Sequence, residues 1–267
     1  MNETVATMDE VEKVPVLRIT NEGREEIDDL IVRESPFTIS LDNQELVTML
    51  CSPTNLKYLA VGFLFSEGLL KEKDEIRKVV VDDRRGMAWI ETKEDRVIDR
   101  ELLSKRLVTS GCGRGASFYT VGDLKDQEKV ESDIRVSPQE IFALVNEFQH
   151  NSEVYKNTHG VHSAALCDRE SILLFSEDIG RHNAVDKVIG ESILKDIPTD
   201  DKMIIISGRI SSEMLLKAAK IRIPVVISIA APTNLGVKVA SDLGITLVGF
   251  VRPKRMTVYS GSWRIAG

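Results

Sequence analysis

Apolar residues in the first hundred positions occur as short segments that alternate with polar residues or are rich in β-branched side chains. Both patterns are typical of β-strands. The strands that we expect from them lie at residues 14–19, 37–41, 45–51, 77–81 and 87–92. With one helix they predict a small α+β domain at residues 14–108, preceded by a flexible, solvated tail at residues 1–13.

The one helical pattern in this domain follows the third of these strands. Ser52 and Pro53 suit the cap and the first position of a helix, and Gly68 suits its C-terminal stop. The apolar residues between them repeat at helical spacing. They are Leu56, Leu59, Ala60, Phe63 and Leu64.

In the second half of the chain, nearly continuous apolar segments alternate with helical patterns. Ser137, Pro138 and Glu140 form a capping box with proline at the first helical position. Further helices are expected at residues 183–194, 211–221 and 234–243, and strands at residues 163–166, 172–175, 203–206, 225–229 and 245–251. Uninterrupted apolar strands indicate a sheet covered on both faces. We therefore predict a three-layer α/β domain at residues 109–267.

Charge and composition narrow the function classes. The chain has 267 residues, a net charge of −7 and no apolar run near the ~20 residues of a membrane span, which disfavours nucleic-acid and membrane partners. The polar, acidic N-terminus lacks the features of a signal peptide. The three cysteines are scattered and odd in number, so they do not form a disulfide framework. We expect a cytoplasmic, reduced protein.

One cysteine lies in a glycine-rich segment, Thr109-Ser110-Gly111-Cys112-Gly113-Arg114-Gly115. Glycines leave room for a large partner near the sulfur. A fixed cation nearby favours the thiolate, lowering a cysteine pKa from ~8.5 to roughly 3.5–7.5 in such settings. Sulfur handling or covalent catalysis needs a thiolate of this kind. The alternative is a flexible glycine turn with an incidental cysteine, and this loop alone leaves both open.

Turns that follow the buried strands are the next candidate sites, since ligands gather beyond the carboxyl ends of strands in such sheets. Ser207-Gly208-Arg209 and Ala231-Pro232-Thr233 each precede a helix, with Thr233 suited to the cap. The last strand runs into Phe250, Val251, Arg252, Pro253, Lys254 and Arg255. The three cations of that segment suit phosphates or pyrophosphates, whereas their spacing alone favours a solvated basic turn.

Metal binding is disfavoured by the ligand pattern. His159 and His162 are three residues apart and His182 lies further on, but the motifs of zinc enzymes and of zinc nucleobase deaminases are missing. Cys51 and Cys167 fall in apolar strands and are expected to be buried and inert. Adjacent acids such as Glu177-Asp178 before a glycine turn are typical of a solvated turn, although they could serve as a base or bind a cation.

An ordered series of motifs along the chain resembles the FdhD family, the sulfur-carrier proteins of formate dehydrogenase maturation. The segments that carry the resemblance are Ser66-Glu67-Gly68, Gly111-Cys112-Gly113, residues 160–165, residues 177–187, Ser207-Gly208-Arg209, and Val248-Gly249-Phe250 with the basic cluster that follows.

The resemblance implies a fold, a function and partners. The fold pairs a small α+β domain with a cytidine-deaminase-like three-layer α/β domain, in a homodimer. Cys112 matches the cysteine that takes sulfur from a cysteine desulfurase as a persulfide. Residues 250–255 match the segment that binds the molybdenum cofactor, bis-molybdopterin guanine dinucleotide, a client to be sulfurated before it enters formate dehydrogenase. His182 and Arg209 are weaker candidates for the same pocket.

The cysteine loop departs from the family pattern at one position. Family members often carry C-x-x-C there, whereas this chain has Gly115 in place of the second cysteine. A dithiol step within the loop is therefore not available. Two other functions stay open at this point: a cofactor chaperone that transfers no sulfur, and a zinc hydrolase or deaminase that uses His159, His162 and Cys112.

Overall fold

The computed structural model describes residues 10–94, 107–108, 116–117 and 128–267. Residues 1–9 of the predicted tail lie outside these residues, and so does the cysteine loop with Cys112. Strands β7 (Leu107–Val108) and β8 (Ala116–Ser117) flank that loop in the sequence and pair antiparallel. No helix within the described ranges is long and apolar enough to cross a membrane.

A mixed six-stranded sheet is the centre of the second half, with strand order β10-β9-β11-β12-β13-β14. Its strands are β9 (His162–Cys167), β10 (Ile172–Asp178), β11 (Met203–Ile206), β12 (Val225–Ser228), β13 (Thr246–Arg252) and β14 (Arg255–Ser260). The middle strands β11, β12 and β13 are parallel, and the other neighbours pair antiparallel. The carboxyl ends of β10, β11, β12 and β13 therefore meet at one edge, together with the start of β9.

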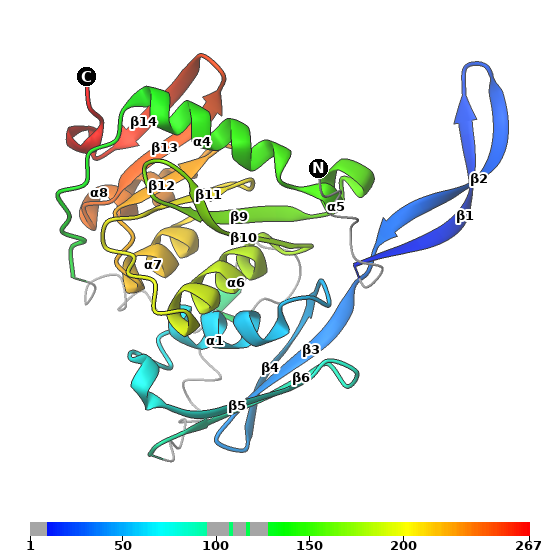
Figure 1. Cartoon of the computed structure of the whole chain (residues 1–267), viewed down its shortest axis with the longest axis horizontal. Coiled ribbons are helices and arrows are strands. Elements are labelled where there is room, and N and C mark those ends of the chain that lie inside the picture. Colours follow the sequence, from blue (N-terminus) through cyan, green and yellow to red (C-terminus); the bar gives the residue numbers. More distant parts are fainter. Residues whose placement is uncertain (1–9, 95–106, 109–115, 118–127) are drawn as a thin grey trace.

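Helices cover both faces of this sheet. Helix α4 (Pro138–His150) packs on one face, against side chains such as Ala165, Ile205 and Ile227. The helices of the other face are α6 (Arg181–Leu194), α7 (Ser212–Lys220) and α8 (Asn234–Asp242), which pack against the alternate residues of the same strands. A strand covered twice must be apolar on both sides, which explains the uninterrupted apolar segments. The predicted three-layer α/β arrangement is confirmed (Figure 1).

Two of the predicted helix starts are confirmed by their hydrogen bonds. In α4, the Glu140 amide donates to Ser137 Oγ (3.3 Å) and the Ser137 amide donates to Glu140 Oε2 (2.6 Å). In α8, the Gly236 amide donates to Thr233 Oγ1 (3.1 Å). These are the bonds that a capping box and a threonine N-cap are expected to make.

The first half contributes a four-stranded sheet of order β4-β3-β6-β5 and helix α1. The elements are β3 (Ser35–Leu41), β4 (Gln44–Cys51), α1 (Leu56–Ser66), the short 3₁₀ helix η1 (Lys73–Glu75), β5 (Ile76–Asp82) and β6 (Met87–Thr92). Helix α1 lies between this sheet and α6 (Figure 1). One cluster of buried side chains runs from Phe37 through Leu59 to Val188, so the two halves share a core.

The predicted start of α1 is wrong by three residues. The N-cap is Asn55, with a left-handed φ of 56°, and not Ser52. Ser52 is used elsewhere: its amide donates to Asp178 Oδ2 (3.0 Å) and its hydroxyl oxygen accepts from the Ile179 amide (3.1 Å). The stop at Gly68 is confirmed, with φ of 76° beyond the end of the helix.

Helices α1 and α6 cross in close contact at two glycines. An added Cβ would lie 1.7 Å from the Asp186 carbonyl oxygen at Gly62, and 2.0 Å from the Tyr58 carbonyl oxygen at Gly190. Only glycine permits this approach. The close crossing brings Asp186 to Lys217 of α7, whose Nζ lies 2.8 Å from the Asp186 carboxylate in a buried cluster.

The first described element is a two-stranded arm made by β1 (Val11–Thr20) and β2 (Gly23–Val32), which extends away from the rest of the molecule (Figure 1). The strand predicted at residues 14–19 is thus present, but it starts at Val11, so the last residues of the predicted tail belong to it. Strand β2 was not predicted, because its run of acidic residues obscures the alternation. The remaining short helices are α5 (Glu153–Thr158), which precedes β9, and η2 (Ser262–Arg264), which follows β14.

Candidate functional site

The candidate site is the sheet edge where the strands β10, β11, β12 and β13 end. Each of the first three leads through a short turn into a helix, so the N-termini of α6, α7 and α8 lie at this edge. Their N-caps are Gly180, Ser211 and Thr233. Helices α6 and α8 carry no acidic residue in their first turns, so no carboxylate of the helix itself offsets the partial positive charge of its N-terminus. Such an edge favours an anionic ligand.

The turns at this edge are tied to one another by hydrogen bonds. The Ile210 amide donates to the Ala231 carbonyl (3.2 Å), and the Thr233 amide donates back to the Ile210 carbonyl (2.9 Å). The Phe250 amide donates to the Ala230 carbonyl (3.1 Å), and Ser228 Oγ donates to the Gly208 carbonyl (2.8 Å). The two predicted turns and the basic segment therefore form one connected platform.

Residues 250–255, predicted as a cofactor-binding segment, form the end of β13, the turn that follows it and the first residue of β14. The cations in it are not equivalent. Arg252 Nη1 donates to the Ile229 carbonyl (2.7 Å) and to the Val251 carbonyl (2.8 Å), so its guanidinium braces the neighbouring turn. Lys254 and Arg255 are exposed and follow directly in the turn. These two are the cations best placed for a ligand.

Phe250 and Val251 face opposite environments within this segment. Val251 is buried in the core beneath α4, so its side chain is structural. Phe250 is 45% exposed and has a left-handed φ of 52°, at the irregularity between Gly249 and Arg252 in the pairing with β14. A non-glycine residue with positive φ is uncommon and strained. The backbone thus holds an aromatic ring at the surface of the site edge.

His162, at the start of β9, lies next to the Ser207 turn. Ser207 Oγ accepts from the Ser163 amide (2.9 Å) and lies 3.3 Å from His162 Nδ1, so the serine hydroxyl and the imidazole share a hydrogen bond. Burial lowers the pKa of His162 below its usual 6.5, and the charges of Arg181 and His182 lower it further. His162 is therefore a neutral hydrogen-bond donor at neutral pH.

Arg181, His182 and Arg209, which lie in turns at the edge, have different environments. At Gly208 an added Cβ would lie 3.1 Å from Arg181 Cδ and 3.5 Å from His162 Nδ1, so both side chains pass over this glycine. His182 Nε2 lies 3.1 Å from Glu213 Oε2, which joins α6 to α7. Arg209 is exposed beside them. The edge thus gathers cationic and hydrogen-bonding side chains that the sequence places far apart.

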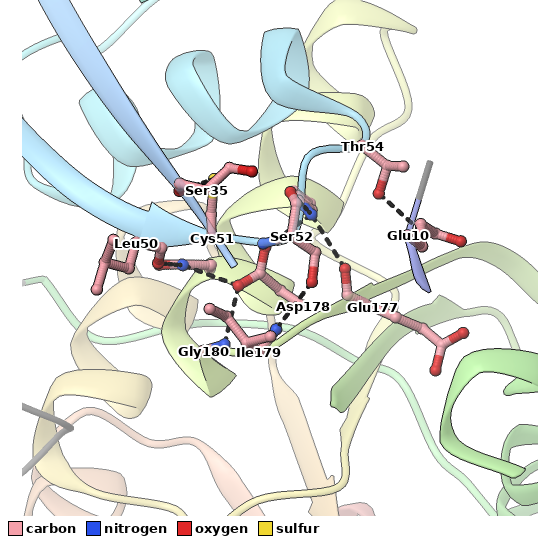
Figure 2. Close-up of polar contacts among 12 residues, drawn as sticks. Glu10, Ser35, Leu50, Cys51, Ser52, Thr54, Glu177, Asp178, Ile179 and Gly180 are labelled. Atoms are coloured by element: carbon pink, nitrogen blue, oxygen red, sulfur yellow. Dashed lines mark hydrogen bonds and ion pairs between the residues drawn. The ribbon is translucent and has the colours of Figure 1, made fainter. Parts of the chain in front are cut away.

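Asp178 anchors the turn that leads into α6 (Figure 2). Its Oδ1 accepts from the Gly180 amide (2.8 Å) and from Asn183 Nδ2 (2.9 Å), while Oδ2 accepts from the Ser52 amide (3.0 Å). It also pairs with Lys187, and both side chains are fully buried. The expectation of a solvated acidic turn is therefore wrong for Asp178. No local pattern could have found this, because Ser52 is 126 residues away.

The described cysteines are buried, as predicted. Burial raises the pKa of the Cys51 thiol to about 12, and burial likewise raises the pKa of Cys167 to about 12. Both are therefore protonated and shielded in the folded chain.

Metal-ligating side chains do not cluster in the part of the chain that the structure describes: no three His, Cys, Asp or Glu residues there are placed to hold one ion. His159 ends α5 and its ring packs edge-on against Tyr155, with 5.0 Å between the ring centroids. His162 instead contacts Ser207. Cys112, the third ligand considered from the sequence, lies outside the described residues.

Comparison with protein families identifies the chain. The model of the FdhD/NarQ family matches residues 32–266, nearly the whole length. The chain belongs to the FdhD/NarQ family. The FdhD/NarQ match includes every turn of the site edge and the cysteine loop, which lies between β7 and β8 in the sequence.

Individual FdhD/NarQ relatives agree over similar lengths. The sulfur carrier protein FdhD of Bacillus subtilis (strain 168) is 42% identical over 239 residues, which cover 90% of this chain and 91% of the relative. The protein of the same name from Staphylococcus aureus (strain MRSA252) is 41% identical over 251 residues, covering 94% and 95%. A crystal structure of a formate dehydrogenase accessory protein from Desulfotalea psychrophila superposes with a TM-score of 0.81 at 28% identity, covering 96% of this chain and all of that one.

Proposed function

We propose that this chain is a sulfur carrier required for formate dehydrogenase activity. It takes sulfur from a cysteine desulfurase as a persulfide on Cys112 and passes it to bis-molybdopterin guanine dinucleotide. Family membership supports the carrier role, since the relatives are named sulfur carriers. One observation supports Cys112 in particular. Of the three cysteines in the sequence, the other two are buried, with pKa values raised to about 12.

The loading step exchanges one sulfur between two thiolates. The Cys112 thiolate attacks the terminal sulfur of the persulfide on the desulfurase. A new S–S bond forms on Cys112, the S–S bond of the desulfurase breaks, and its cysteine leaves as a thiolate. Arg114, two residues away in the sequence, favours the anionic form of Cys112. Onward transfer of the sulfur as sulfide takes two electrons, which we assign to a thiol reductant, and it returns Cys112 to the thiolate.

The site edge fits the anionic, nucleotide-bearing cofactor, which supplies the molybdenum centre that receives the sulfur. The N-termini of α6, α7 and α8 favour its phosphates, and Lys254 and Arg255 are exposed beside them. Phe250 offers an exposed aromatic face on which a guanine can stack. Arg252 supports this surface by bracing the Ile229 turn. In this proposal residues 250–255 bind the cofactor, as the family resemblance implies, except that the side chain of Val251 lies in the core.

The proposal includes the partners and the compartment. The cysteine desulfurase is the donor, formate dehydrogenase receives the sulfurated cofactor, and the carrier acts in the cytoplasm as a homodimer. A reducing compartment is consistent with the free thiols of Cys51 and Cys167 and with the odd number of cysteines in the sequence.

The test is the intact mass of the full chain after incubation with a cysteine desulfurase and L-cysteine, without reductant. We expect a gain of one sulfur atom in the wild type and in Cys167→Ala, and none in Cys112→Ala. Cys167→Ala is the matched control because it removes a buried thiol. Sulfur gained by Cys112→Ala would overturn the assignment. No gain in the wild type, with guanosine diphosphate still bound, would identify a cofactor chaperone without sulfur transfer, the function that Gly115 leaves open.

A further inference from the structure

The turn between β11 and α7 offers hydrogen-bond donors that the rest of the fold does not use. The amides of Gly208 and Arg209 donate to no other residue that the structure describes. Two carbonyls of the same turn are in use, since Gly208 accepts from Ser228 Oγ (2.8 Å) and Ile210 accepts from the Thr233 amide (2.9 Å). A turn that presents successive free amides is suited to an anion.

Ser211, the N-cap of α7, adds a buried hydroxyl. The residue is 8% exposed, and its Oγ makes no hydrogen bond within the described ranges. Its backbone is extended (φ −93°, ψ 170°), as in a capping residue, so the hydroxyl lies at the N-terminal end of the helix. It makes no cap bond, whereas Ser137 and Thr233 do so in α4 and α8. A buried hydroxyl without a partner is unfavourable, and a ligand oxygen that accepts from it removes this cost.

The charged side chains around this turn favour an anion. Arg181 passes over Gly208, where an added Cβ would lie 3.1 Å from Arg181 Cδ, and Arg209 is exposed. The opposing carboxylate belongs to Glu213 in the first turn of α7, and it lies 3.1 Å from His182 Nε2. Even with His182 counted as neutral, the two arginines outweigh the one carboxylate.

The kind of donor at this turn indicates which anion fits. The turn offers backbone amides, one hydroxyl and one guanidinium, all at the N-terminus of a helix. An ionised phosphate group presents several acceptor oxygens on different sides, and such donors at a helix N-terminus are a common place for one. The turn therefore matches a phosphate group.

We propose that the β11–α7 turn is a phosphate cradle, formed by the amides of Gly208 and Arg209, the hydroxyl of Ser211 and the guanidinium of Arg181. Its ligand class is a phosphate ester or a diphosphate. The inference rests on the proposed function for the source of the phosphate, a nucleotide arm of the cofactor, and it names a turn separate from residues 250–255. Inorganic pyrophosphate has the same chemistry, so the experiment compares the two sources.

The experiment is calorimetric titration of the full-length chain with guanosine diphosphate, guanosine and inorganic pyrophosphate. Guanosine diphosphate is expected to bind at least about tenfold more tightly than guanosine, which carries no phosphate. Ser211→Ala removes one hydrogen bond to a charged group. It is expected to weaken the binding of both phosphate ligands roughly tenfold and to leave the binding of guanosine unchanged.

A second variant, Ser211→Asp, separates binding from folding. Aspartate is a preferred N-cap residue, so urea denaturation should find this variant at least as stable as the wild type. Its carboxylate repels a phosphate, so the affinity for both phosphate ligands should fall further than in Ser211→Ala. Ser241→Asp adds the same charge at an exposed position in the last turn of α8, and it should bind both ligands as the wild type does.

The outcomes distinguish the phosphate cradle from the proposed function. Unchanged affinity for guanosine diphosphate and pyrophosphate in both Ser211 variants would overturn the phosphate cradle alone. Binding of pyrophosphate without guanosine diphosphate would support the cradle and overturn the nucleotide as its source. Binding of neither ligand to the wild type would overturn the cradle together with the cofactor site. Intact mass after sulfur loading, measured in parallel, reports on Cys112 in every case.

Discussion

Asp178 Oδ2 and Lys187 Nζ lie 2.7 Å apart, and neither side chain is exposed to solvent. Lys187 also donates to the carbonyls of Ser52 (3.2 Å) and Glu177 (3.1 Å). The pair therefore holds the connection between β4 and α1 against the start of α6. Through Gly180, it sets the position of the N-terminus of α6.

Removing one charge of this pair should destabilise the chain strongly. Asp178→Asn leaves the Lys187 ammonium buried without its counter-ion, which costs about 3–5 kcal/mol for such pairs. Urea denaturation measures the loss. Glu91→Gln, which breaks the exposed pair with Arg77, is expected to cost less than about 1 kcal/mol. Equal losses in the two variants would contradict the buried pair.

The α1–α6 crossing predicts a steric effect. Gly62→Ala places a methyl group 1.7 Å from the Asp186 carbonyl oxygen, so the helices must move apart. Overpacking of this kind costs about 1–3 kcal/mol or more. Lys57→Ala, at an exposed position of the same helix, should change the free energy of unfolding by less than about 0.5 kcal/mol. A Gly62→Ala variant as stable as the wild type would show that the contact is not tight.

We expect the buried thiols of Cys51 and Cys167 to be alkylated only when the chain is unfolded. With pKa values raised to about 12, Cys51 and Cys167 are protonated at pH 8 apart from roughly one molecule in ten thousand. Iodoacetamide followed by peptide mapping should find neither residue labelled in the native chain, and both labelled in urea. Labelling of either one in the native chain would contradict its burial.

We expect His162 to contribute to the pH dependence of the free energy of unfolding. Its pKa in the folded chain lies below the usual 6.5, so between these values the unfolded chain binds more protons. Stability is therefore lost as the pH falls through 6.5 toward the lowered pKa. Urea denaturation between pH 5 and pH 8 should show a smaller loss for His162→Gln than for the wild type. His150→Gln, at the exposed end of α4, controls for removal of an imidazole. The same slope in His162→Gln and the wild type would contradict the assignment.

The basic turn predicts that Arg252 and Lys254 act differently. Arg252→Ala removes the bond to the Ile229 carbonyl, worth about 1–3 kcal/mol for a charged donor, so it should lower stability as well as ligand affinity. Lys254→Ala should leave stability within about 0.5 kcal/mol of the wild type and weaken binding of guanosine diphosphate. Calorimetric titration and urea denaturation measure the two effects. Unchanged affinity in Lys254→Ala would remove Lys254 from the site.

Local patterns were enough for much of the fold. Alternation and helical spacing predicted most strands and helices, and the caps of α4 and α8 involve residues only three positions apart. The burial of Cys51 and Cys167 followed from their apolar strands in the same way. Strand β2 was not predicted, because its acidic residues obscure the apolar alternation. Ser52 was wrongly predicted as a helix cap, because its partner Asp178 is 126 residues away in the sequence.

By itself, the sequence determined the order of most strands and helices, although not β2, α5 or β14, together with the three-layer α/β arrangement and the turns that follow the buried strands. These depend on periodicity and on contacts between neighbours in the chain. The tertiary structure decided which side chains of those turns act together: it buried Asp178 with Lys187, tied Arg252 to the Ile229 turn and set His162 beside Ser207. The state of a charge depends on its solvent exposure and on its partners, and only folding brings those partners within reach.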